Sequence, residues 1–493
     1  MTICTDERNG SIPLPMSRPA ESMFVKSLSL VAALLALVVG GLLIAAPVSE
    51  AETTDRQVHP GPAVAVTPVL SARRFPGSIQ GSVGDADLSA SLDQYLNKVV
   101  GSTCALVKQD GRVIYSRTPS DALTPASTLK LATALAALDI LGRDSTFTTR
   151  FLAAKPLKNG VVDGDLYVVG GGDPLFVTPG YKTVFDDPDQ FYEDFSTLAN
   201  TLADAGVKEI RGGIIGDDSR YDATRWVSSW PAKYQIGGTV GPLSALMVND
   251  GSTGYSETPN EQTTNRKAGD PPALFAATLR TVLVARGIKV GGGASTGRAP
   301  SDNSEIATFD SVPLTKVVSE MLTDSDNTTA ELITKEIGLA AKGQGWTSAG
   351  VEAVKDSLVR QGFDITGFTM LDGSGLDTGN RMTCNLALAL ITRIADDPEF
   401  ADALPVGGKT GTLRKRMQAT SSTGRVRAKT GTLNSVNALV GFADTPQGSE
   451  LTFALIHNGN DTRTTGVADG FTDRLMLYAK GSPMNLLQPL PPK

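Results

Sequence analysis

Hydrophobic residues are most concentrated in one segment near the N-terminus. Residues 28–46 (LSLVAALLALVVGGLLIAA) are almost wholly apolar, and about 20 apolar residues are enough to cross a bilayer. Lys26 precedes the segment and Glu50 follows it, which favours an N-terminus left in the cytoplasm. Residues 49–51 also offer the small side chains that a signal peptidase recognises. Residues 1–51 are therefore expected to form a cytoplasmic stub with either a cleaved signal peptide or an uncleaved anchor. Both interpretations place the rest of the chain outside the cytoplasm, either membrane-anchored or secreted.

Further along, the pattern predicts a linker, a helix, a hairpin and a buried helix. Residues 52–84 are rich in Pro, Gly and small polar residues, which is typical of a linker. A helix is expected at 87–100. Two short apolar runs around Asp-Gly predict a hairpin over 105–115. Residues 127–141 are apolar on most faces and predict a buried helix.

The pattern changes again between residues 151 and 304. Short strand-like runs separated by glycine turns dominate there, with one helix expected at 271–286. This segment is expected to be a separate module. After it, the pattern predicts helices at 312–322 and 328–340, strands at 425–433, 438–443 and 451–457, and a last helix at 462–480.

Composition narrows the classes of function. A chain of 493 residues suggests two or three domains. The net charge is −7 and no basic block stands out, which argues against a nucleic-acid partner. The chain has two histidines and three cysteines, too few and too dispersed to predict a metal site. Cys104 and Cys384 are expected either to form one disulfide or to remain as two buried thiols.

Ser127 and Lys130 form the first candidate catalytic pair. Serine is a weak nucleophile and needs a base to accept its proton. Residues three apart share one face of a helix, so these two side chains can meet there. The positive end of the helix dipole would favour a developing alkoxide, and burial would lower the pKa of Lys130.

Ser325 and Asn327 form the second candidate, in the break between two predicted helices. A hydroxyl and an amide on a short turn can relay a proton and hold a substrate carbonyl. The same tripeptide occurs at 301–303, where the polar, proline-flanked context predicts a simple loop.

Lys429, Thr430 and Gly431 form the third candidate, on a predicted strand. A lysine there would supply a fixed positive charge for a substrate carboxylate, and glycine would let the substrate approach the backbone. The same three residue types recur at 409–411, followed by charged residues. A turn is expected there, so Lys429 is preferred over Lys409.

The order Ser-x-x-Lys, Ser-x-Asn, Lys-Thr-Gly is shared by penicillin-binding proteins and serine β-lactamases. Residues 125–130 (PASTLK), 325–331 (SDNTTAE), 371–376 (LDGSGL) and 427–433 (RAKTGTL) resemble the class C penicillin-binding proteins. These are the D-alanyl-D-alanine carboxypeptidases and endopeptidases. Residues 171–174 (GGDP) and 216–217 (GD) resemble the module inserted in that group. One difference is that members of the group carry Asp-Gly-Thr where this chain has residues 409–412 (KTGT).

The resemblance implies an α/β (α+β) fold, a transpeptidase-like antiparallel sheet flanked by helices. That domain is expected at 85–150 and 305–482, with the mostly β module at 151–304 inserted and a tail at 483–493. The long interval between Ser127 and Ser325 agrees with such an insertion, which β-lactamases lack.

The resemblance also implies roles. The substrate would be a peptidoglycan stem peptide ending in D-Ala-D-Ala, or a D,D-cross-link, with β-lactam antibiotics as covalent inhibitors. Ser127 would attack with Lys130 as base, and Ser325 would pass a proton to the leaving D-alanine. The remaining site residues would bind substrate: Asn327, Lys429, Thr430, Gly431 and Thr432. The backbone N–H groups of Ser127 and Thr432 would form the oxyanion hole, and no metal or organic cofactor would be needed.

Two alternatives stay open, a serine β-lactamase and a catalytically idle wall-binding protein of the same fold. Three other features are given structural interpretations. Asp217-Asp218 is expected to be a turn, and Trp226 and Trp230 are expected to pack within the inserted module. His457 is expected to satisfy a local hydrogen bond.

Overall fold

The computed structural model describes residues 76–479, apart from 237, 256–265, 398, 399, 401 and 460–465. The described residues all belong to one compact unit, Val69–Lys493. The apolar segment at 28–46 and the tail at 483–493 lie outside them. Within the described ranges, no helix is both long enough and apolar enough to span a membrane.

A five-stranded antiparallel sheet is the centre of the main fold, with the strand order β15-β16-β17-β1-β2. Its strands are β1 (Ser102–Gln109), β2 (Arg112–Arg117), β15 (Val426–Leu433), β16 (Val436–Asp444) and β17 (Glu450–Asn458). The predicted hairpin is confirmed, because Asp110 and Gly111 turn the chain with φ values of +48° and +77°. The three C-terminal strands are confirmed as well. Because β1 pairs with β17, the first and last parts of the chain share one sheet.

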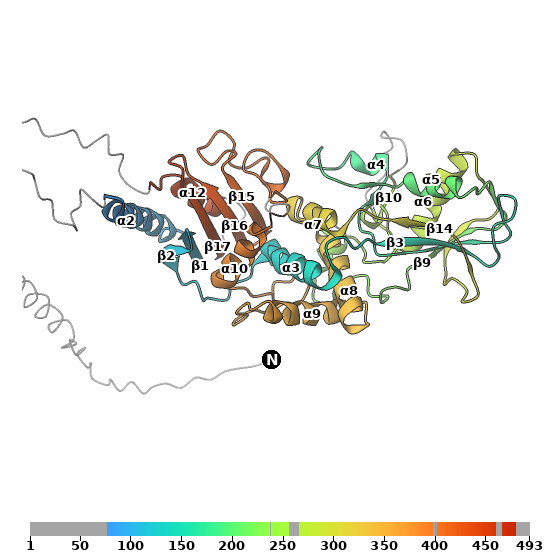
Figure 1. Ribbon diagram of the computed structural model, residues 1–493, viewed down its shortest axis with the longest axis horizontal. Coiled ribbons are helices and arrows are strands. Elements are labelled where there is room, and N and C mark those ends of the chain that lie inside the picture. The colour runs from blue at the N-terminus through green and yellow to red at the C-terminus, as the bar shows by residue number, and fades with distance from the viewer. Residues whose placement is uncertain are drawn as a thin grey trace, which may run out of the picture. The chain divides into compact units, whose positions relative to one another are not determined.

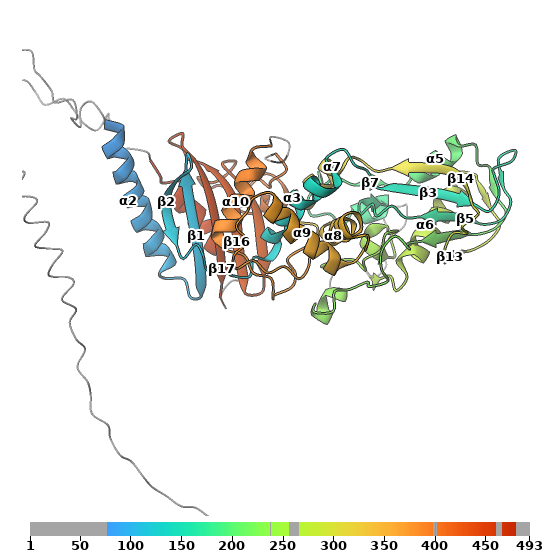
Figure 2. The same ribbon diagram turned by 60° about the horizontal axis from the view of Figure 1, so that its bottom comes forward.

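Helices cover both faces of this sheet, because alternate residues of its strands point to opposite sides. On β17, Ala454 and Ile456 pack in one hydrophobic cluster, and Phe453 and Leu455 pack in another. The first cluster includes residues of the helices at 130–141, 314–323, 327–342, 347–360 and 384–395. The second includes residues of the helices at 76–96 and 466–475 (Figures 1 and 2). The helices are α2 (Pro76–Leu96), α3 (Lys130–Leu141), α7 (Leu314–Thr323), α8 (Asn327–Lys342), α9 (Thr347–Arg360), α10 (Cys384–Ala395) and α12 (Gly466–Leu475).

A second five-stranded sheet has the order β13-β9-β5-β3-β14. It is mixed, since β5, β9 and β13 are parallel while β3 pairs antiparallel with β5 and β14. Its own core includes Phe176, Phe195 and Phe275, whose rings meet edge to face. The strands are β3 (Thr148–Ala153), β5 (Leu166–Val169), β9 (Ile214–Asp217), β13 (Ala294–Thr296) and β14 (Ser304–Asp310), accompanied by α5 (Thr197–Asp204) and α6 (Pro271–Ala285). Figure 1 labels most of these elements.

Shorter elements complete the segment between β3 and β14. They are β4 (Val161–Val162), β6 (Phe176–Val177), α4 (Pro179–Lys182), β7 (Glu193–Asp194), β8 (Glu209–Ile210), β10 (Ser252–Thr253), β11 (Arg266–Lys267) and β12 (Lys289–Val290). The prediction of a single helix in this segment is wrong, because α5 and the short α4 accompany the predicted α6.

The structure differs from the predicted helices in several places. Helix α2 begins at Pro76, inside the predicted linker, and ends at Leu96 rather than at residue 100. Its glycines disfavour a helix locally, but tertiary contact overrides this. A Cβ on Gly84 would lie 2.2 Å from the carbonyl oxygen of Ala479, so glycine permits the close approach.

Helices α9 and α10 were not predicted, although both are amphipathic. The last predicted helix ends at Leu475 rather than at residue 480. Its predicted start at 462–465 lies outside the described residues.

Cys104 and Cys384 form a disulfide, which resolves the open choice between a bridge and two thiols. It joins β1 to the first residue of α10, and both cysteines are fully buried. The two residues are 280 positions apart in the sequence. A cross-link that closes so long a loop restricts the unfolded chain strongly.

We predict that replacing both cysteines, Cys104→Ala with Cys384→Ala, lowers the free energy of unfolding by about 2–4 kcal/mol. Chemical denaturation measures this directly. Dithiothreitol should bring the parent protein close to the double variant and leave the double variant unchanged. Equal stability of the parent and the double variant would show that the bridge does not stabilise the fold.

Candidate active site

Ser127 lies in a tight 3-10 turn, Ala126–Leu129, rather than in the first turn of the following α-helix. Helix α3 begins at Lys130, so the predicted helix at 127–141 is confirmed from that residue onward. Ala126 has a φ of +48°, a value that L-residues rarely adopt. Ser127 is half-buried, whereas Ala126, Thr128 and Leu129 are buried. The turn therefore presents the serine to the surface while its neighbours anchor it.

Lys130 is fully buried, and its ammonium group makes three hydrogen bonds. Nζ donates to Ser127 Oγ at 2.9 Å, to Asn327 Oδ1 at 2.7 Å and to the carbonyl of Ser374 at 2.8 Å. Burial lowers the pKa of Lys130 to about 8, although the nearby carboxylates of Asp326 and Asp372 act in the opposite direction. The lysine is thus placed and tuned to accept a proton from Ser127.

Asn327 is the first residue of α8, after the predicted break between α7 and α8. Its Oδ1 accepts from Lys130 and its Nδ2 donates to the carbonyl of Thr239 at 2.7 Å. Asp326 caps the helix by accepting from the N–H of Thr329 at 2.9 Å. The structure therefore joins Asn327 directly to the serine–lysine pair.

Ser325 lies in the same break, with a φ of +63°. In the part of the chain that the structure describes, no hydrogen bond connects it to Ser127 or Lys130. The second copy of this tripeptide, at 301–303, lies in a loop before β14, and Asn303 Nδ2 donates to the carbonyl of Pro300 at 2.6 Å. The interpretation of that copy as a loop is confirmed.

Four candidate residues lie on strand β15, beside the 3-10 turn that contains Ser127: Lys429, Thr430, Gly431 and Thr432. Lys429 is fully buried, Thr430 is buried and Thr432 is exposed. A Cβ on Gly431 would lie 2.5 Å from the carbonyl oxygen of Pro125. Glycine is therefore needed here for the close contact between β15 and the serine turn. The expectation that Gly431 also lets a substrate approach the backbone stays a prediction.

Burial lowers the pKa of Lys429 well below its usual value, and the charge of Lys130 lowers it further. The carboxylate of Asp324 acts in the opposite direction. Lys429 therefore loses its proton more readily than an exposed lysine. A substrate carboxylate would favour the protonated form, because an opposite charge raises the pKa of a lysine.

The first Lys-Thr-Gly copy forms turns, and Lys409 is exposed, as expected. Its neighbour Thr412 nevertheless reaches the site, since its Oγ1 lies 2.9 Å from Thr430 Oγ1. Sequence reasoning missed Thr412, because only the folded chain brings it beside β15.

Glu331 is a second residue whose role the sequence did not reveal. It is fully buried on α8, and its Oε1 accepts from the N–H groups of Gly373 at 3.0 Å and Ser374 at 2.7 Å. These contacts fix the loop whose Ser374 carbonyl accepts from Lys130. Burial raises the pKa of Glu331 to about 8, and the charge of Asp372 adds to this. Glu331 therefore positions an acceptor of Lys130, and no hydrogen bond between described residues joins Glu331 to that lysine.

Asp372 organises the same loop. It accepts from the backbone N–H groups of Gly375 at 2.9 Å and Asp377 at 2.6 Å, and from Trp230 Nε1 at 2.8 Å. The expectation that Trp230 packs within the inserted module is therefore incomplete. This tryptophan also contacts the loop beside Lys130.

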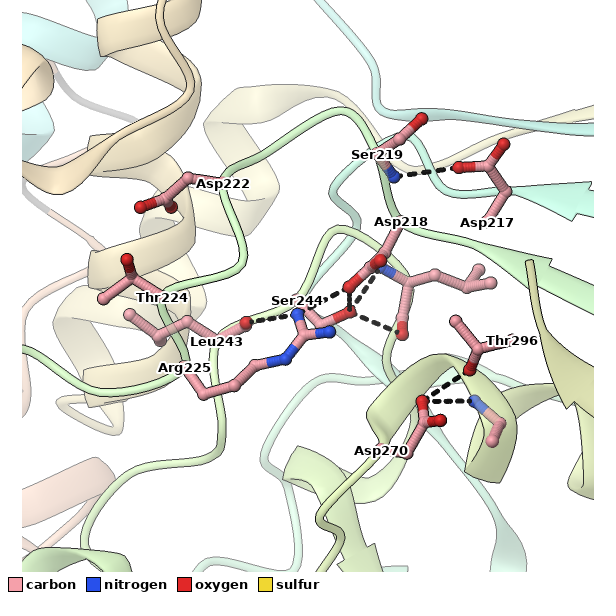
Figure 3. Close-up of polar contacts among 12 residues, drawn as sticks. Asp217, Asp218, Ser219, Asp222, Thr224, Arg225, Leu243, Ser244, Asp270 and Thr296 are labelled. Atoms are coloured by element: carbon pink, nitrogen blue, oxygen red, sulfur yellow. Dashed lines mark hydrogen bonds and ion pairs between the residues drawn. The ribbon is translucent and has the colours of Figure 1, made fainter. Parts of the chain in front are cut away.

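The remaining sequence features are structural. Asp217 accepts from the N–H of Ser219, and Asp218 accepts from Arg225 Nη1 at 2.5 Å and from Ser244 Oγ at 2.8 Å (Figure 3). The expected turn lies just after this pair rather than at it, because Asp217 ends strand β9 and the turn begins at Ser219.

His457 has the local hydrogen bond that was expected, because its Nδ1 lies 2.8 Å from Thr103 Oγ1. Over the described ranges, no cluster of three or more His, Cys, Asp or Glu residues is arranged to bind a metal ion.

Comparison with known proteins places the chain among peptidases. The sequence profile of the D-Ala-D-Ala carboxypeptidase 3 (S13) family matches residues 86–268 and 256–469. A D-alanyl-D-alanine carboxypeptidase from Actinomadura sp. is 29% identical over 80% of this chain and 84% of its own. A carboxypeptidase from Mycobacterium tuberculosis is 29% identical over 83% and 86%.

The crystal structure of penicillin binding protein 4 from Haemophilus influenzae has a related fold. It superposes with a TM-score of 0.63 at 22% identity, covering 80% of this chain and 99% of its own. The expected fold, an antiparallel sheet flanked by helices, is confirmed.

We predict that Glu331→Ala lowers the rate of serine acylation at least tenfold, because two buried N–H groups lose their acceptor and release the Ser374 loop. Glu331→Gln should stay within about threefold of the parent, since an amide oxygen can still accept both bonds. The rate of covalent labelling by a penicillin, per folded molecule, is the measurement.

Glu336→Ala is the matched control on the same helix. Glu336 pairs with Arg220 and Tyr221, so its loss should reduce stability without slowing acylation. Equal losses of acylation in the two alanine variants would contradict a positioning role for Glu331.

Proposed function

Because this chain belongs to the D-Ala-D-Ala carboxypeptidase 3 (S13) family, it is a serine D,D-peptidase, and we propose that Ser127 is its nucleophile. The observation that carries the proposal is the 2.9 Å hydrogen bond between Lys130 Nζ and Ser127 Oγ in a buried environment. Such an arrangement activates a hydroxyl that is unreactive at its own pKa. Family membership implies action on peptidoglycan stem peptides outside the cytoplasm.

The proposed reaction proceeds in two steps through an acyl-enzyme. Lys130 accepts the proton as Ser127 Oγ attacks the carbonyl of the penultimate D-alanine. The backbone N–H groups of Ser127 and Thr432 would stabilise the oxyanion, a contribution of roughly 3 kcal/mol per donor in other hydrolases. Ser325 would pass a proton to the departing D-alanine. Water then releases the peptide and restores the serine.

Substrate binding is assigned to the strand and the turn that flank Ser127. Lys429 and Thr430 would receive the terminal carboxylate, and Gly431 would keep β15 in contact with the serine turn. Asn327 would hold the substrate amide while it orients Lys130. No metal or organic cofactor enters this mechanism, and β-lactam antibiotics would acylate the same serine.

We propose the same domain organisation that the sequence predicted. Residues 85–150 and 305–482 would form the peptidase domain, with 151–304 as the inserted module. The membrane would be contacted only through the N-terminal segment, as an anchor or during secretion.

We predict that Ser127→Ala abolishes covalent labelling by fluorescent penicillin, because it removes the hydroxyl that Lys130 contacts. Circular dichroism should match the parent protein. Peptide mapping of the parent should place the label on Ser127, and a labelled serine elsewhere would refute the assignment.

Lys429→Ala is expected to slow acylation at least tenfold, since it removes the charge-assisted contact to the carboxylate. Lys409→Ala provides the matched control in the other Lys-Thr-Gly copy and should stay close to the parent. The second-order rate constant of penicillin acylation compares them. If Lys409→Ala were the slower variant, the assignment of the two copies would be reversed.

The acylation rate should rise with pH along a limb near pH 8, because only the neutral amine of Lys130 can accept the proton. Lys130→Arg should be nearly inactive at every pH, because guanidinium keeps its proton. A parental rate in Lys130→Arg would mean that another group is the base.

A further inference from the structure

A cavity of about 330 Å³ lies next to the catalytic residues but does not include them. It is bordered by Asp326, in the break between α7 and α8, and by Thr412, which contacts Thr430. Six residues with carboxyl side chains line it: Asp186, Asp187, Asp250, Glu320, Asp324 and Asp326.

The positive charges at this cavity do not balance the negative ones. Arg414 and Lys415 line it, but both contact Asp186: Arg414 donates to its carbonyl oxygen, and Lys415 Nζ lies 2.8 Å from its carboxylate. Across the described residues, none of the other five carboxylates forms an ion pair. Asp187, for example, accepts only backbone N–H groups, including that of Gly411 at 2.8 Å.

Glu320 gives a second, independent indication of a ligand, because one of its buried oxygens has no hydrogen-bond partner among the described residues. Its side chain lines the cavity and is only 3% exposed. Oε1 accepts from Gln190 Nε2 at 2.9 Å, whereas Oε2 has no hydrogen-bond partner among the described residues. A buried carboxyl oxygen without a donor is costly. Burial, with Asp326 and Asp324 nearby, also raises the pKa of Glu320.

The rest of the lining indicates which kind of cation would fit. Tyr181 contributes an aromatic ring to the lining, and carboxylates beside aromatic faces are typical of sites for organic ammonium groups. Two further rings already lie under the chain's own ammonium groups: Lys182 Nζ is 4.8 Å from the centre of the Tyr192 ring, and Lys316 Nζ is 5.2 Å from that of Phe191. No group of acids in the described ranges has the arrangement of a metal site. An alkylammonium group therefore fits better than a metal ion.

The position of the cavity indicates which part of a substrate reaches it. Thr430, which receives the terminal carboxylate in the proposed function, is 2.9 Å from Thr412 at the cavity border. We propose that this cavity is a subsite for an ammonium-bearing side chain on the departing D-residue. The proposal rests on the proposed function, because it takes its direction from where that function places the substrate carboxylate.

The test compares two peptides, diacetyl-L-Lys-D-Ala-D-Lys and diacetyl-L-Lys-D-Ala-D-norleucine. They differ only in the terminal amine of the departing residue. In the parent protein, kcat/KM for the D-Lys peptide should exceed that for the D-norleucine peptide by about tenfold or more. Glu320→Gln and Asp324→Asn should each reduce this ratio at least threefold. Asp302→Asn, in the other Ser-Asp-Asn copy, should keep it. Taking the ratio within each protein cancels any general loss of activity.

Binding to the Ser127→Ala protein separates this proposal from the proposed function. Calorimetry should show the D-Lys peptide binding about tenfold more tightly than the D-norleucine peptide, and this measurement needs no turnover. Equal binding, or a preference that survives both Glu320→Gln and Asp324→Asn, would overturn the subsite. A D-Lys preference without hydrolysis of any D-Ala peptide would support the subsite and refute the proposed function.

Discussion

The buried ammonium group of Lys130 is the constraint on which the rest of the site depends. A charge removed from water is tolerated only when its hydrogen bonds are replaced. The three acceptors here come from three separate elements: the serine turn, the start of α8 and the loop at residues 373–375. Each element must therefore be held where its oxygen meets Nζ. Glu331, Asp372 and Gly431 are explained by this requirement, since each fixes one of these elements or brings β15 against them.

Electrostatic balance in the site follows from the same burial. Lys130 and Lys429 repel each other, and both lie within the influence of carboxylates that are themselves largely buried. Burial favours the neutral form of lysines and of carboxyl groups alike. Few groups in the site are therefore charged at every pH near neutrality. A bound substrate carboxylate would favour the protonated forms of the two lysines. Such a site can use one lysine as a base and the other as a binding group without both being charged at once.

The sequence predicted the parts of the fold that local patterns determine. The hairpin follows from Asp110-Gly111, strands β15 to β17 follow from their apolar runs, and the break before Asn327 follows from its polar residues. The start of α2 was not predictable, because its glycines are accommodated only by contact with the C-terminal segment. The serine–lysine pair was predicted from its spacing together with the order of the three motifs. Thr412, Glu331 and the acidic cavity depend on contacts between distant segments, which no local pattern records. The loop at 371–376 and residue 331 belong to the segments that resemble the family, but the resemblance implied no role for them.

The pairing of β1 with β17 has a consequence for the order in which the protein matures. The main sheet cannot close until Glu450–Asn458 has been synthesised and exported to the same side of the membrane as β1. Pairings between such distant segments form late and slowly. Strand β15, with Lys429, is likewise made long after Ser127. A nascent chain therefore carries an ordinary, unactivated serine through synthesis and export. The site proposed around Ser127 is assembled only when the last strands arrive, so the order of folding would delay catalysis until then.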